Sequence, residues 1–213
     1  MPNTKIRVAI VDDHEVVREG IRNMLTAVPD FEIVGEATDG DGARDLIARL
    51  KPHVMVLDLV MPGESPYAIM RWAAQAHPET AVLVLTGHAK QRALAQMLQA
   101  GAVGFLDKKQ DKADLITAIR NAAAGQTTYT QEQYRSAKAW YEDVHEPWHS
   151  LSPTKQALLR ALGAGLSNAE IAAQLHLSEK TVRKYVSEIF ATLGVSSRTQ
   201  AALWWQKSGL DEG

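Results

Sequence analysis

The chain has 213 residues, of which 46% are apolar and 23% are charged, and its formal net charge at pH 7 is −2. This length suits two domains, and the balanced composition disfavours intrinsic disorder and fibrous structure. The absence of cysteine excludes disulfides, thiolate metal sites and cysteine nucleophiles. No apolar run approaches the roughly 20 residues of a membrane span, and the N-terminus has no signal-peptide pattern, so we expect a cytoplasmic protein.

Residues 1–125 alternate between two kinds of periodicity. Short β-branched runs predict five strands, at Ile6–Val11, Glu32–Ala37, Val54–Leu57, Ala81–Leu85 and Val103–Leu106. Helical spacing between and after them predicts five helices, at His14–Ala27, Gly40–Leu50, Tyr67–Ala76, Lys90–Gln99 and Asp111–Ala123. Alternating strands and helices indicate βαβ units, and therefore one doubly wound α/β domain whose five-stranded parallel sheet is covered on both faces.

Residues 126–150 lack a sustained apolar period, and we interpret them as a linker with one short helix around Gln131–Asp143. From Leu151 to the end of the chain the pattern is helical only. Four helices are predicted in this part, over Pro153–Ala164, Asn168–Leu175, Ser178–Leu193 and Ser197–Lys207. The pairs Ser167/Glu170 and Ser197/Gln200 have the spacing of capping boxes. Residues 151–213 are thus expected to form an all-α domain of four helices. They carry a net charge of +2, whereas residues 1–125 and 126–150 each carry −2.

Polar residues gather at the predicted strand ends of the first domain. The first strand is followed by Asp12-Asp13, the third by Asp58, and the fourth and fifth by Thr86 and Lys108. In a doubly wound sheet these ends lie at one edge, where ligands bind. An oxygen-only site suits Mg²⁺, and a carboxylate beside this ion can attack a phosphoryl group and carry it as an acyl phosphate. The hydroxyl and the ammonium can bind the phosphoryl oxygens.

Four segments at these strand ends carry a family resemblance: Val8–His14, Val56–Gly63, Leu85–Gly87 and Gly104–Lys108. In this order they resemble the receiver domain of bacterial two-component response regulators, over residues 5–124. The resemblance implies a flavodoxin-like fold and makes Asp58 the phosphoacceptor. It implies that Asp13 and Asp58 ligate Mg²⁺ directly, that Asp12 does so through water, and that the carbonyl of Val60 completes the protein ligands.

The same resemblance assigns the phosphoryl group to Thr86 and Lys108. Thr86 and Phe105 occupy the positions of the conformational switch, although tyrosine is commoner than phenylalanine at the second. One departure is the segment Glu64-Ser65-Pro66, where the family usually has a small flexible loop. Because proline fixes φ and lacks an N–H, we expect a stiffer loop beside Asp58 and an altered rate of phosphorylation.

In the second domain, Asn168–Leu175 and Ser178–Leu193 flank a tight turn at His176-Leu177, which predicts a helix-turn-helix. Apolar residues of the longer helix form one stripe, made of Val182, Val186, Ile189, Phe190 and Leu193. Short polar and cationic residues lie off this stripe in the first half of the helix, as entry into a DNA major groove requires. From charge alone, a helical protein-interaction domain with a solvated cationic face is the alternative.

Four segments decide between these interpretations: Leu151–Pro153, Gly165–Ala172, Leu177–Arg183 and Leu193–Ala201. They resemble the LuxR/NarL/FixJ type of helix-turn-helix over residues 151–203. The resemblance implies base contacts by Arg183, Lys184 and Ser187, and phosphate contacts by Asn168, Lys180 and Thr181. It implies a dimerisation surface on the last helix, with Ala201, Ala202 and Trp205. Two departures are Lys155, where glutamate is usual, and Tyr185, where histidine is usual. We expect Lys155 to lose an internal salt bridge and Tyr185 to pack and reach a phosphate.

Together the motifs indicate a transcriptional response regulator of the NarL/FixJ type, and not a conventional enzyme. A sensor histidine kinase would phosphorylate Asp58, and the altered receiver would release or dimerise the part that binds double-stranded DNA. The implied partners are the kinase, DNA, a second copy of the chain and RNA polymerase. Two alternatives remain open: a phosphorylation-independent DNA-binding regulator with a vestigial receiver, and a phosphatase with an aspartyl nucleophile. The phosphatase would need a second carboxylate where Val60 stands.

Overall fold

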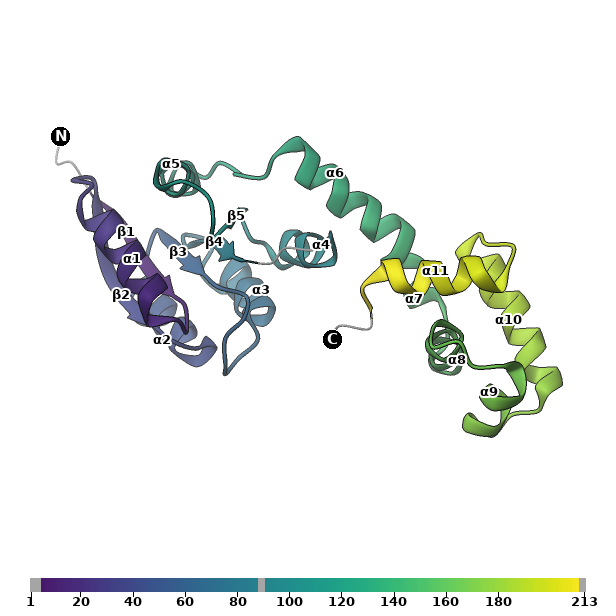
Figure 1. Ribbon diagram of the computed structural model, residues 1–213. Helices are drawn as coiled ribbons and strands as arrows, with labels where there is room; N and C mark the ends of the chain where they lie inside the picture. Colours follow the sequence, from purple (N-terminus) through teal and green to yellow (C-terminus); the bar gives the residue numbers. More distant parts are fainter. Residues whose placement is uncertain (1–4, 88–90, 211–213) are drawn as a thin grey trace. The chain divides into compact units, whose positions relative to one another are not determined.

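The computed structural model describes residues 5–87 and 91–210 and divides the chain into two compact units, residues 1–135 and 136–213 (Figure 1). Among the described residues, no helix is long and apolar enough to cross a bilayer.

The first unit contains a five-stranded sheet whose neighbouring strands are all parallel. The strands are β1 (Ile6–Val11), β2 (Phe31–Ala37), β3 (Val54–Leu57), β4 (Ala81–Thr86) and β5 (Gly104–Asp107). Their spatial order is β2-β1-β3-β4-β5. This is the flavodoxin-like order, in which the winding direction reverses between β1 and β3. The predicted doubly wound α/β fold is confirmed, with strand bounds that differ from the predicted ones by one residue at most.

Five helices follow the strands in turn: α1 (Glu15–Thr26), α2 (Gly40–Leu50), α3 (Pro66–Ala76), α4 (Gln91–Ala100) and α5 (Lys112–Ala123). Lys90, the predicted start of the fourth helix, lies outside the described residues. Apolar side chains of β1, β3, β4 and β5 form one core with α1 and α5, including Val8, Val56, Leu83 and Ile119. Because side chains alternate along a strand, the buried Met55 and Leu57 point to the opposite face of the sheet.

The segment 126–150 is structured, and its ends belong to different units. The Thr128 backbone N–H donates to the carbonyl of Val103, the residue before the edge strand β5, at 2.9 Å, which attaches this part of the chain to the first unit. The following helix α6 (Gln131–Trp140) crosses the division at residue 135 and continues as a π-helix, η1 (Tyr141–His145), and as α7 (Glu146–Ser150). Trp148 belongs to the core of the second unit, and the Trp140 indole N–H donates to the Ser208 carbonyl at 3.0 Å. The division between the compact units falls at residue 135, inside the segment 126–150, and burial of these two indoles fixes the second half of the segment in the second unit.

The four predicted helices of the second unit are α8 (Pro153–Gly163), α9 (Asn168–Gln174), α10 (Glu179–Leu193) and α11 (Arg198–Ser208). The Ser167 hydroxyl and the Glu170 carboxylate form the predicted capping box of α9. At α11 the prediction is only half right: the Ser197 hydroxyl accepts from the Gln200 N–H, but the Gln200 side chain accepts from the N–H of Ser196.

Candidate functional site

The carboxyl edge of the sheet brings together the acidic residues of β1 and β3 and the lysine after β5. Asp12 follows the last residue of β1, and Asp58 follows the last residue of β3, on either side of the point where the winding reverses. Their side chains are only 2% and 3% exposed. Two carboxylates are thus placed side by side and almost inaccessible to solvent. Their negative charges repel each other unless a cation neutralises them.

Lys108 supplies this compensation. Its Nζ lies 2.6 Å from Oδ2 of Asp12 and 2.9 Å from Oδ2 of Asp58. Burial alone would lower the pKa of the Lys108 ammonium, but hydrogen bonds to both carboxylates and their negative charges outweigh burial and raise this pKa. Lys108 is therefore charged at neutral pH and, from the end of β5, bridges the carboxylates that follow the neighbouring strands β1 and β3.

Asp13 lies at the exposed side of the same cluster. Its Oδ1 is 2.6 Å from Nδ1 of His14, the residue that precedes α1. One ligand atom from each of Asp12, Asp13, His14 and Asp58 fits within a span of 4.8 Å. Three of the four groups are carboxylates, and hard oxygen donors of this kind suit Mg²⁺. The residues present therefore fit a magnesium ion, as the sequence predicted.

The loop between β3 and α3 is tied to α2. Glu64 accepts two hydrogen bonds from the Arg44 guanidinium, each of 2.6 Å, and the Pro62 carbonyl accepts from the N–H of Gly40 at 3.0 Å. Gly63 has φ of +84°, a backbone conformation that favours glycine. Pro66 is the first residue of α3, where its fixed φ and missing N–H fit a helix start. This loop, which carries the exposed Val60, is therefore held by hydrogen bonds to α2, and its stiffness and its effect on phosphorylation stay predictions.

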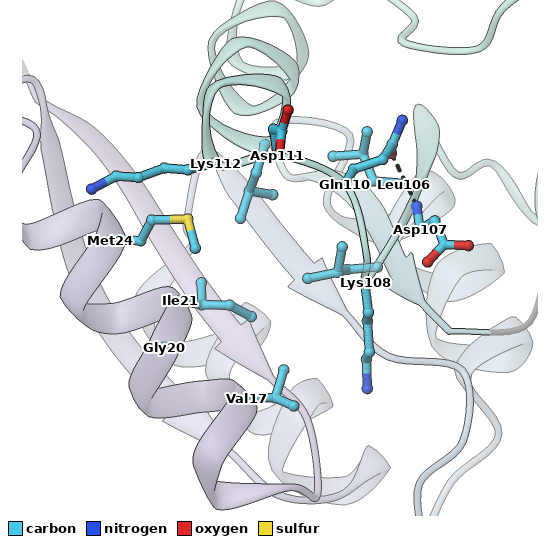
Figure 2. Close-up of a pocket in the computed structure, with 12 residues that line it drawn as sticks. Val17, Gly20, Ile21, Met24, Leu106, Asp107, Lys108, Gln110, Asp111 and Lys112 are labelled. Carbon is cyan, nitrogen blue, oxygen red and sulfur yellow. Dashed lines mark hydrogen bonds between the residues drawn. The ribbon is translucent and has the colours of Figure 1, made fainter.

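Thr86 and Phe105 lie on the strands next to the acidic cluster. Thr86 is the buried last residue of β4, and its carbonyl accepts from the Lys108 N–H at 3.1 Å. Phe105 is half-buried on β5, opposite Val84 of β4. A cavity of about 220 Å³ adjoins Lys108. Figure 2 shows Val17 and Met24 of α1 on one side of it and Lys108 on the other.

In the second unit, α9 and α10 form the predicted helix-turn-helix. The turn between them contains His176, whose φ is +53°. The predicted apolar stripe of α10 is confirmed: Val182 and Ile189 are buried, and Val186, Phe190 and Leu193 pack against the same core.

The predicted DNA contacts lie mainly on the opposite side of α10. The exposed ones are Lys180, Arg183, Lys184 and Ser187, whereas Thr181 and Asn168 are partly exposed. The Asn168 side chain accepts a hydrogen bond from the Arg198 guanidinium at 3.2 Å, which ties α9 to α11.

Lys155 corrects one expectation. It does not lack an internal ion pair, because its Nζ lies 2.8 Å from Oε2 of Glu188 on α10. Glu188 is absent from the predicted site residues, although its spacing of four residues after Lys184 indicates a helix ion pair.

The predicted dimerisation residues do not form a surface together. Ala201 and Trp205 are 0% and 3% exposed and belong to the core of their own unit, where Trp205 packs against Trp148 at 5.4 Å between ring centroids. Only Ala202 of the three predicted residues is partly exposed, and Leu203 beside it is exposed. The side of α11 that carries Ala201 and Trp205 therefore faces the core of its own unit, and dimerisation through this helix stays a prediction.

Comparison with known proteins gives a consistent result for both units. Residues 8–120 match the response regulator receiver domain, and residues 149–205 match the bacterial regulatory proteins of the luxR family. The transcriptional regulatory protein DegU of Brevibacillus brevis is 31% identical over 223 residues, which cover 96% of this chain and 94% of DegU. The nitrate/nitrite response regulator protein NarP of Escherichia coli is 33% identical over 202 residues, 94% of each chain.

Solved structures of the response regulator RcsB are similar over nearly the whole chain. One from Salmonella typhimurium has a TM-score of 0.69 and 25% identity, and covers 95% of this chain and all of that one. A complex of RcsB with DNA has a TM-score of 0.64 at the same identity and covers 96% and 99% of the two chains. With a receiver domain at its N-terminal end and a LuxR-type helix-turn-helix at its C-terminal end, the chain belongs to the two-component response regulators that bind DNA and control transcription.

Proposed function

We propose that Asp58 accepts a phosphoryl group from a sensor histidine kinase and that this modification controls DNA binding by the second unit. The observation that carries the proposal is the position of Asp58: a buried carboxylate at the winding reversal, with Lys108 Nζ at 2.9 Å and two further aspartates within reach of one metal ion. Each group needed to accept and hold a phosphoryl group is present at this edge.

The chain's own residues perform the transfer as follows. A carboxylate oxygen of Asp58 attacks the phosphorus atom, the bond from phosphorus to the donor's imidazole nitrogen breaks, and that nitrogen keeps the electron pair. Asp58 Oδ1 accepts a hydrogen bond from the Leu59 N–H at 2.8 Å, which fixes the orientation of the carboxylate. Lys108 and the Thr86 hydroxyl bind phosphoryl oxygens after transfer.

Asp12, Asp13, Asp58 and the carbonyl of Val60 would hold Mg²⁺. When bound, this ion neutralises negative charge on the phosphoryl oxygens. The donor set, which consists of oxygen atoms apart from the neighbouring imidazole of His14, supports the roles of the three aspartates, and the role of Val60 rests on the family resemblance.

The alternatives from the sequence gain no support. A vestigial receiver would lack part of the acidic cluster or its lysine, and neither is missing. A phosphatase would need a carboxylate two residues after Asp58, where the exposed side chain of Val60 offers none.

The test is labelling of the full chain by a small phosphodonor such as acetyl phosphate. We expect the wild type to form a hydroxylamine-sensitive phosphoryl adduct and Asp58→Asn to form none. Asp45→Asn on α2, an exposed carboxylate that is paired with Arg49 and lies outside the acidic cluster, is the matched control and should label normally. Labelling of Asp58→Asn at the wild-type level would show that another residue is the acceptor.

For the second unit, we propose that α10 enters the major groove of double-stranded DNA. Arg183, Lys184 and Ser187 then contact bases, and Asn168, Lys180 and Thr181 contact phosphates. The phosphorylated chain acts as a homodimer; the similar protein RcsB has been solved as two dimers bound to two parallel DNAs, which supports this part of the proposal. We also propose a cytoplasmic location, which the DNA target supports, and RNA polymerase as a further partner.

A further inference from the structure

Both departures of the second unit from its family pattern meet at one place. Lys155, in the first turn of α8, has its Nζ 2.8 Å from Oε2 of Glu188 and 5.9 Å from the centre of the Tyr185 ring. Glu188 and Tyr185 both belong to α10, the proposed DNA-reading helix. Lys155, which stands where the family usually has glutamate, thus faces a carboxylate on the neighbouring helix. In this contact between helices the cation belongs to α8 and the anion to α10.

The other oxygen of Glu188 faces a residue of the DNA-reading surface. Its Oε1 lies 3.8 Å from Nζ of Lys184, one helical turn earlier. The Lys184 side chain is 73% exposed, whereas that of Lys155 is 26% exposed. Glu188 therefore makes one short contact that is partly shielded from water and one long contact that is open to water.

The two contacts differ in strength for this reason. The Lys155–Glu188 pair is short and partly shielded, so it is screened less than an exposed pair, and the cation–π contact with Tyr185 restricts the ammonium of Lys155 further. The hydrogen bond from Lys155, followed by the charges of Lys155 and Lys184, lowers the pKa of the Glu188 carboxyl, so this group stays ionised at neutral pH. The exposed pair with Lys184 is weak, as solvent-exposed ion pairs generally are. Lys184 can therefore leave Glu188 when a better acceptor is offered.

We propose that Glu188 is a positioning residue for DNA recognition: Lys155 fixes its carboxylate, and the carboxylate directs the Lys184 ammonium and keeps it from binding phosphates indiscriminately. The inference rests on the proposed base contact of Lys184. An unrestrained lysine on this surface binds the phosphates of any sequence, since phosphate contacts carry no sequence information. The fixed negative charge of Glu188 beside Lys184 weakens these phosphate contacts. It does not prevent contacts in which a base acceptor takes the place of the carboxylate.

The test compares the affinities of the full chain for a duplex selected by binding and for its scrambled version, across a salt series. Glu188→Gln keeps the shape and removes the charge. We expect the scrambled duplex to gain more affinity than the selected one. The ratio of selected to scrambled affinity should then fall by about five- to tenfold, which is within the discrimination that one base contact provides. Glu179→Gln removes one exposed carboxylate from the first turn of the same helix and should raise both affinities alike.

A charge-swapped variant separates positioning from folding. Lys155→Glu combined with Glu188→Lys rebuilds the interhelix ion pair with opposite polarity, so the melting temperature should stay near the wild-type value. The affinity ratio should nevertheless remain low, because Lys184 then has a lysine one turn away. If Glu188→Gln and Glu179→Gln gave the same ratio, or if the swapped chain regained the wild-type ratio, Glu188 would not position Lys184. If instead Lys184→Ala left the ratio unchanged, the proposed base contact itself would be wrong.

Discussion

Lys108→Met is the most direct test of the electrostatics of the receiver. Lys108 Nζ contacts a carboxylate oxygen of Asp12 at 2.6 Å and one of Asp58 at 2.9 Å, and both acids are almost fully buried. Methionine keeps most of the side chain's length and removes the charge. In the absence of Mg²⁺, the variant leaves two adjacent buried carboxylates without the ammonium that bridges them.

The cost has an upper limit set by protonation. Removing one partner of a buried ion pair costs about 3–5 kcal/mol. One carboxyl can instead take up a proton, and from an ordinary aspartate pKa of about 3.9 this costs about 5 kcal/mol at pH 7.5 and about 2 kcal/mol at pH 5.5. The folded variant thus binds more protons than its unfolded chain, so its stability relative to wild type should rise as the pH falls. We expect a loss of about 3–5 kcal/mol at pH 7.5 and about 2 kcal/mol at pH 5.5.

The measurement is urea unfolding followed by circular dichroism in the presence of a chelator at both pH values. Hydrogen exchange of peptides from β1 and β3 assigns the loss to the receiver. Lys109→Met changes the exposed neighbouring lysine and serves as the matched control. Equal unfolding midpoints for the two variants at pH 7.5, or a loss that grows on acidification, would refute the reasoning.

Three further predictions concern the metal, the DNA and pH. Mg²⁺ at a hundred times its dissociation constant should stabilise the wild type by about 2.7 kcal/mol. In thermal melts Asp13→Ala should lose most of this gain and Asp45→Ala none of it. Equal gains in the two variants would contradict the proposed metal site. Lys184→Ala should reduce the ratio of selected to scrambled DNA affinity, whereas Lys180→Ala should lower both affinities and reduce the salt slope by about one; an unchanged ratio in the first variant would contradict the proposed docking. Burial and, secondly, the neighbouring His149 lower the pKa of His145, so the stability of the second unit should decline as the pH falls below about 6.5. His145→Phe, which cannot titrate, should show a smaller decline in melting temperature between pH 7.5 and 5.5, and an undiminished decline would assign the effect to other groups.

The sequence predicted the sheet and the acidic cluster well because both depend on local patterns. A buried parallel strand is a short apolar run, and the residue that follows it lies at the carboxyl edge whatever the details of packing. Asp12, Asp58 and Lys108 could therefore be placed together before any contact was known. The sequence does not show which of these side chains pair with one another. Only the structure shows that Lys108 bridges the two buried carboxylates and that Asp13 lies beside His14.

Features that depend on long-range packing were predicted less well. The family resemblance assigns Ala201 and Trp205 to a dimer surface, and the periodicity of the last helix does not show that this side faces its own core, where both residues are buried. The segment 126–150 has a linker-like composition, yet Trp140 and Trp148 are fixed by contacts with residues more than fifty positions away. Such contacts leave no local period in the sequence.

Each unit contains a lysine whose ammonium is paired with carboxylate. The burial of each pair determines which group can replace the carboxylate. Lys108 lies in short contact with two carboxylates that are nearly inaccessible to water, so its release requires a group of comparable charge, as a phosphoryl group on Asp58 would be. Lys184 lies 3.8 Å from the partly exposed carboxylate of Glu188, so a neutral base acceptor in a groove is enough to replace this carboxylate as its partner. The receiver lysine is therefore suited to respond to a change in charge, and the lysine of α10 to respond to the identity of a base.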